Sequence, residues 1–179
     1  MCRAHHTTHS CGSSVLSCTG RSGLGRGSSH RRARGGALVL PVPPGWRNAR
    51  QTAPAPTVSF TPASGGSFQV LVSPLVATDG RLVPATRESL RSLVETGATQ
   101  AKSQSVEKSL LVQSFGSGEV QGNYFSATDR APKAGEFKYL TQGAMSVSGL
   151  PVAFTILSNG NPQAAVEPAL RMLGAARKE

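Results

Sequence analysis

The residue types that most often supply nucleophiles, acid–base groups and metal ligands are confined to one end of this sequence. All three cysteines and all four histidines lie within the first 30 of 179 residues: Cys2, Cys11, Cys18, His5, His6, His9 and His30. They form no CxxC pair and no matching second half-site, which a tetrahedral zinc site would require. The rest of the chain lacks a thiol nucleophile, an imidazole base and the soft metal ligands. We therefore expect no metal site and no histidine-dependent catalysis there.

Two other patterns could carry chemistry, and both have a simpler interpretation. The run from Gly116 to Gly122 is only superficially similar to a phosphate loop, because its glycines do not follow GxGxxG and no Lys-Ser or Lys-Thr follows it. Asp129, Glu119 and Glu136 could pair for hydrolysis, but they flank turns, where acids normally face water or cap local amides. We predict that the chain is not an enzyme and binds no cofactor. A hydrolase that uses Asp129 and Glu136 is the alternative.

A small group of cations and aromatic residues is the candidate binding surface. A positive loop lies close in the sequence to aromatic strand residues and could hold an anionic ligand or an acidic partner. Its members, with the only tryptophan added, are Arg130, Lys133, Lys138, Tyr124, Tyr139 and Trp46. The alternative is structural, since aromatic residues in paired strands usually contact each other, and a tryptophan at a strand end usually anchors the core.

The formal net charge of +10 is unevenly distributed. Residues 1–35 contain six arginines and no acid, and they show neither helical nor strand periodicity. This composition predicts a disordered leader that is misassigned or processed. The alternatives are an organellar transit peptide, a zinc site, or a nucleic-acid arm built on Arg31, Arg32 and Arg34. No signal peptide is visible, and no apolar run approaches the length of a membrane span.

Residues 36–179 are expected to form one domain, in the order β-β-β-α-β-β-β-β-α. Short apolar runs bounded by Gly and Pro predict strands, and apolar residues three and four positions apart predict helices. Thr86 and Asn161 are the expected helix caps, and Pro168 should kink the second helix or divide it in two. The predicted strands are 37–40, 58–61, 68–73, 109–115, 120–127, 137–147 and 151–158. Pro44 and Gly45 fit the central positions of a type II turn after the first of these strands. Short links make the later strands an antiparallel meander, so the fold class is α+β.

The segment Leu38-Val39-Leu40-Pro41-Val42-Pro43-Pro44-Gly45-Trp46 resembles the start of the PsbP-like and DcrB-like proteins, a strand followed by Pro-x-Gly-Trp. The PsbP-like and DcrB-like proteins share their α/β/α sandwich fold with the Mog family of Ran-binding import factors. Tyr124 with Phe125, the run 137–139, the run 154–157 and a terminal helix agree with the resemblance, which covers most of residues 36–179.

The resemblance implies an α/β/α sandwich, with a mainly antiparallel sheet of about six or seven strands and helices on both faces. It also implies a non-enzymatic accessory or binding module, periplasmic or otherwise exported, with an unknown protein or cell-envelope partner. Two alternatives stay open. One is a small-ligand carrier with a pocket between sheet and helix, near Trp46 or the loop 130–138. The other is a basic-tailed protein associated with nucleic acid.

Overall fold

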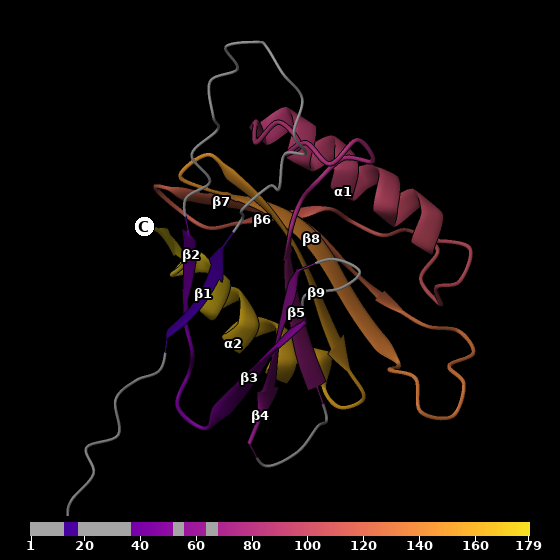
Figure 1. Ribbon diagram of the computed structural model, residues 1–179. Coiled ribbons are helices and arrows are strands. Elements are labelled where there is room, and N and C mark those ends of the chain that lie inside the picture. Colours follow the sequence, from indigo (N-terminus) through magenta and orange to yellow (C-terminus); the bar gives the residue numbers. More distant parts are fainter. Residues whose placement is uncertain (1–12, 18–36, 52–55, 64–67) are drawn as a thin grey trace, which may run out of the picture.

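The computed structural model describes residues 13–17, 37–51, 56–63 and 68–179, which form ten strands and two helices in that part of the chain (Figure 1). The strands are β1 (Ser13–Ser17), β2 (Ala37–Pro41), β3 (Trp46–Gln51), β4 (Thr57–Pro62), β5 (Phe68–Pro74), β6 (Gln113–Phe115), β7 (Val120–Thr128), β8 (Tyr139–Val147), β9 (Leu150–Ser158) and β10 (Arg177–Lys178). The helices are α1 (Arg87–Ala101) and α2 (Pro162–Gly174).

Seven strands form one sheet in the order β3-β4-β5-β9-β8-β7-β6, and every neighbouring pair is antiparallel. The predicted α+β class with an antiparallel sheet is therefore confirmed. Turn residues fix the register. Ser148 and Gly149 both have positive φ, +47° and +79°, and they join β8 to β9 with Val147 opposite Leu150. Two successive positive φ values match the right-handed twist of the strands, which favours such two-residue hairpins.

The helix α1 begins at the predicted cap. The Thr86 side-chain oxygen accepts a hydrogen bond from the Ser89 backbone nitrogen at 3.2 Å. Leu90 and Val94 are buried on the helix face that packs against the sheet, where Phe125 and Ala144 belong to the same core cluster. Of the apolar stripe predicted from the helical spacing, Leu90, Val94 and Ala98 are buried in the packed face of α1, whereas Leu93 is 42% exposed.

The helix α2 also begins as the sequence predicts. The Asn161 side chain accepts from the Gln163 backbone nitrogen at 3.0 Å, and Pro162 lies in the first turn. The prediction that Pro168 divides the helix in two is wrong, because α2 continues through it. Pro168 has no N–H to donate to the carbonyl of Ala164. Ala164 is exposed, so water can hydrogen-bond that carbonyl in place of the missing donor.

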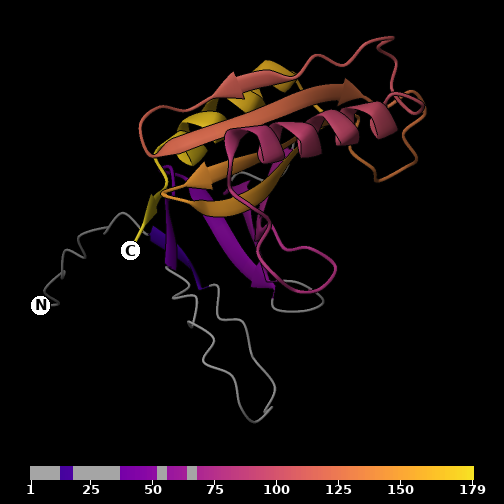
Figure 2. The same ribbon diagram turned by 90° about the horizontal axis from the view of Figure 1, so that it is seen from above.

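The two helices pack against different sides of the sheet (Figure 2). Ala144 and Met145 are neighbours in β8, so their side chains point to opposite faces. Ala144 belongs to the cluster that contains the buried face of α1, whereas Met145 belongs to the larger cluster that contains α2. We refer to these as the α1 face and the α2 face of the sheet.

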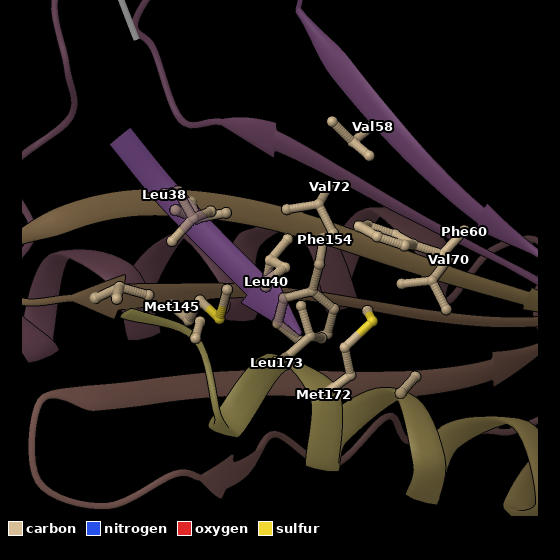
Figure 3. Packing of buried hydrophobic residues seen from close by; sticks show 14 of the residues in the cluster. Leu38, Leu40, Val58, Phe60, Val70, Val72, Met145, Phe154, Met172 and Leu173 are labelled. Atoms are coloured by element: carbon tan, nitrogen blue, oxygen red, sulfur yellow. The ribbon is translucent and has the colours of Figure 1, made fainter. Parts of the chain in front are cut away.

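The first predicted strand lies outside the main sheet, which is a correction. Instead, β2 is the centre of a small sheet in the order β1-β2-β10. Its Leu38 and Leu40 are buried in the α2-face cluster, and Figure 3 shows them with Met172 and Leu173 of α2. The apolar run correctly predicted a buried strand. A sequence pattern does not specify, however, which other strands that strand pairs with.

Three strands were not predicted at all: β1, β3 and the two-residue strand β10. The strand β3 has no alternation of apolar side chains, because its residues after Trp46 are all exposed at the edge of the sheet. Within residues 1–35 the structure describes Ser13–Ser17 alone, and these residues pair antiparallel with β2. That pairing, rather than any periodicity of its own, defines β1. The observed order of elements thus departs from the predicted one at both ends of the chain.

Candidate binding surfaces

The loop between β7 and β8 holds the predicted cations, and most of its contacts stabilise the loop itself. The Arg130 guanidinium donates to the Ser105 carbonyl at 2.9 Å, and the Arg130 backbone nitrogen donates to the Gln104 carbonyl at 3.0 Å. The Lys138 ammonium nitrogen lies 5.2 Å from the centre of the Tyr139 ring, within cation–π range. Lys133 is exposed. Of the predicted surface, the structure brings Arg130, Lys133, Lys138 and Tyr139 to this one end of the sheet.

The acids proposed for hydrolysis accept local hydrogen bonds. Asp129 accepts from the Ala131 backbone nitrogen at 2.9 Å, and Glu136 accepts from the Lys133 backbone nitrogen at 3.0 Å. Glu119 accepts from the Ser148 hydroxyl at 2.7 Å, across two neighbouring turns. These contacts agree with the turn-capping interpretation. Asp129 and Glu136 also border a hollow of about 540 Å³ beneath the loop.

Trp46 lies neither on the same strand as any other predicted residue nor on a neighbouring strand. It lies on the edge strand β3, whereas Tyr124 lies on β7, five strand spacings away in the sheet order. The Trp46 ring is half-buried and meets Phe68 edge to face with 5.1 Å between ring centres. The anchoring interpretation therefore fits Trp46 better than membership of one binding surface.

Tyr124 borders a groove on the α2 face that the sequence analysis did not identify. The groove measures about 720 Å³ and lies between α2 and the two strands β6 and β7. Its apolar residues are Phe115, Tyr124, Val166 and Leu170, all half-buried. We call this feature the α2 groove.

Two glycines make room for the aromatic rings beside the α2 groove. Gly122 and Gly143 lie on the α2 face of adjacent strands. A methyl group at Gly122 would overlap the Phe115 ring, and one at Gly143 would overlap the Phe154 ring. The two rings meet edge to face with 5.4 Å between centres. Glycines within apolar strands, next to aromatic residues, were the available sequence signal for this arrangement.

The charged groups of the α2 groove balance each other. The Tyr124 hydroxyl donates to the Gln113 side-chain oxygen at 2.7 Å, and burial raises the pKa of the Tyr124 phenol, so that it stays neutral at physiological pH. Glu167 and Arg171, both on the rim, form an exposed ion pair at 3.4 Å. The groove therefore carries no net charge from its lining side chains, and its floor is apolar.

A third hollow, which we call the α1 cavity, lies on the α1 face. It measures about 600 Å³ and is bordered by the first turn of α1 and by the turns β6–β7 and β8–β9. In contrast to the α2 groove, most of its side chains are polar: Arg87, Ser114, Ser117, Glu119, Gln121, Asn123, Ser146 and Ser148. Arg87 is exposed and borders this cavity.

Glu107 has the most strongly perturbed carboxyl group in the described part of the chain. Partial burial raises its pKa, but hydrogen bonds from Ser105 and Thr128 outweigh that effect and lower the pKa to about 2. The carboxylate accepts from the Thr128 hydroxyl at 2.6 Å and from the Thr128 backbone nitrogen at 2.9 Å. These contacts fasten the segment after α1 to the end of β7, so we assign Glu107 a structural role.

Several predicted sites lie outside the described residues. They include every cysteine and histidine and the arginine run Arg31, Arg32 and Arg34. Within the described ranges, no group of three His, Cys, Asp or Glu side chains could hold a metal ion. None of the helices in those ranges is long and apolar enough to span a membrane. Comparisons with protein-family models, with curated proteins and with solved structures find no match for this chain.

Proposed function

We propose that this chain is a non-enzymatic binding module with a PsbP-like or DcrB-like α/β/α sandwich, and that its α2 groove binds an apolar segment of a partner protein. The packing of one helix on each side of an antiparallel sheet supports the fold assignment. The observation that carries the functional proposal is the groove itself, an aromatic and aliphatic hollow of about 720 Å³ with an ion-paired rim.

The edge strand beside the α2 groove favours an extended peptide as the occupant. β6 is only three residues long and ends the order of the seven-stranded sheet, so its outer side has no strand partner among the described residues. An extended segment can pair with such an edge and place alternate side chains in a neighbouring hollow. Phe115 and Tyr124 would contact those side chains. Leu111, which is 74% exposed just before β6, extends the apolar surface along the same edge.

Site-specific photo-crosslinking in the native cells tests this proposal. A benzophenone amino acid is placed at Gln163, on the rim of the α2 groove, or at Gln100, an exposed residue of α1. Because both are exposed helical glutamines, Gln100 is a matched control. We expect a protein adduct from position 163 alone, and a several-fold lower yield when Val166→Asp places a charge in the groove wall. Adducts of equal yield at both positions, or none at 163, would contradict the proposal.

A second candidate is the small-ligand carrier, and the α1 cavity is the observation that favours it. Neither Trp46 nor the cation loop borders this hollow. The α1 cavity therefore lies elsewhere than the ligand pocket expected from the sequence, which was placed near Trp46 or the loop 130–138.

A further inference from the structure

The α1 cavity contains a buried amide with unused hydrogen-bonding capacity. Asn123 points to the α1 face, because it lies opposite Ala144 in the register of β7 and β8, and it is only 3% exposed. Its side-chain oxygen accepts from the Ser114 hydroxyl at 2.9 Å. Within the described residues, its amide nitrogen donates no hydrogen bond. Leaving a buried donor unpaired costs about 1–3 kcal/mol, so such a group in a cavity wall points to an absent acceptor.

The first turn of α1 supplies further donors at the same cavity. Thr86 satisfies the backbone nitrogens of Ser89 and Leu90. The N–H groups of Arg87 and Glu88 have no partner among the described residues, as expected for the first turn of a helix. The helix N-terminus carries partial positive charge, which favours anions. The Arg87 guanidinium adds a full charge and forms no ion pair within the described ranges.

We propose that the α1 cavity binds a small hydroxylated monocarboxylate. The carboxylate would accept hydrogen bonds from Asn123, from the first turn of α1 and from Arg87. Glu119 is the one acid that borders the cavity in the described structure, and its carboxylate accepts from Ser148. Among the described residues, Arg87 is the one cation in the cavity lining, so a second negative charge on a ligand would have no cationic partner and would be repelled by Glu119. Gln121 and the wall serines supply partners for ligand hydroxyl groups.

The α1 cavity and the α2 groove have only Phe115 and Gly116 in common. Asn123 and Tyr124 are consecutive in β7, so their side chains lie on opposite faces of the sheet. Arg87 borders only the α1 cavity and Val166 only the α2 groove, so variants at these two residues test the two proposals separately.

Amide chemical-shift titrations of the full chain, labelled with ¹⁵N, test the proposal. The probes are gluconate, which combines a carboxylate with hydroxyl groups, and sorbitol, its uncharged counterpart. We expect gluconate to shift the backbone amides of Arg87 and Glu88 and the side-chain amide of Asn123. Sorbitol should bind at least about tenfold more weakly, because it lacks the charge-assisted hydrogen bonds. Equal shifts with both probes, or no shifts with gluconate at these three residues, would overturn the proposal.

Variants identify the contributing side chains. Arg87→Gln should weaken gluconate binding about tenfold, whereas Arg91→Gln, one turn further along α1, should change it less than about twofold. Asn123→Asp should also weaken binding about tenfold, because it replaces the amide donor by a negative charge. The exposed Arg87 is not part of the core, so its variant remains informative if Asn123→Asp fails to fold. Equal effects of Arg87→Gln and Arg91→Gln would assign the binding to general surface charge and reject the site.

Discussion

Glu107 and Thr128 are 21 positions apart in the sequence, yet two hydrogen bonds join them. The Glu107 carboxylate accepts from the Thr128 hydroxyl at 2.6 Å and from the Thr128 backbone nitrogen at 2.9 Å. Ser105 donates to the same carboxylate. Thr128 is the last residue of β7, so this cluster joins the connection after α1 to the end of a central strand. The acid is therefore part of the fold.

Replacing Glu107 by Gln should lower the free energy of unfolding by about 1 kcal/mol. The neutral amide accepts weaker hydrogen bonds than the carboxylate does, and its two N–H groups would face the donors of Ser105 and Thr128. Urea denaturation followed by circular dichroism measures the change. Glu179→Gln, at the exposed C-terminus, is the control and should leave the unfolding midpoint where it was. If both variants unfold at the same urea concentration, the contacts of Glu107 contribute no net stability.

The lowered pKa of Glu107 predicts a specific acid sensitivity. A carboxyl group whose pKa is lower in the folded state stabilises the fold above its unfolded value, and it loses that contribution as the pH falls toward the folded value. For Glu107 the loss should occur between roughly pH 4.5 and pH 2. The stability difference between the wild type and Glu107→Gln should therefore shrink across that window. A difference that is constant from pH 6 to pH 2.5 would contradict the hydrogen-bonded state of this carboxylate.

Gly143→Ala should be strongly destabilising, by about 2 kcal/mol or more, since overpacking a core costs this much when the neighbours cannot move. An added methyl group would lie 2.5 Å from the Asn123 carbonyl oxygen and closer still to the Phe154 ring. Gly174→Ala, at the end of α2, is the matched control because nothing lies within 4 Å of its added methyl. Thermal unfolding of both variants provides the comparison. Equal melting temperatures would show that the Phe154 ring moves aside without cost.

Pro168→Ala should stabilise the protein, by about 1–3 kcal/mol, because it restores a backbone donor within α2 and removes a steric clash. Thermal unfolding measures this gain. The control is Glu167→Ala, which removes only an exposed ion pair and should shift stability by about 0.5 kcal/mol or less. A Pro168→Ala variant less stable than the wild type would indicate that the proline ring contributes packing that alanine cannot replace.

The sequence determined the elements whose signals are local. Thr86 and Asn161 were identified as helix caps because a cap contacts backbone only two or three residues away. The turn at Pro44 and Gly45 followed from the residues themselves, and the structure gives Gly45 a φ of +76°. Short apolar runs bounded by Gly and Pro indicated the strands of the meander, and the short links between them indicated that these strands are antiparallel.

Only the tertiary structure decided which elements meet. The pairing of β2 with β1 and β10, the continuity of α2 through Pro168, and the distance of Trp46 from Tyr124 depend on partners far away in the sequence. The α2 groove requires β6, β7 and α2 together, and the α1 cavity requires Arg87 beside Asn123. Hollows are defined by packing between distant segments. A sequence pattern indicates which residues are expected to be buried, but it does not specify where their packing leaves a groove or a cavity.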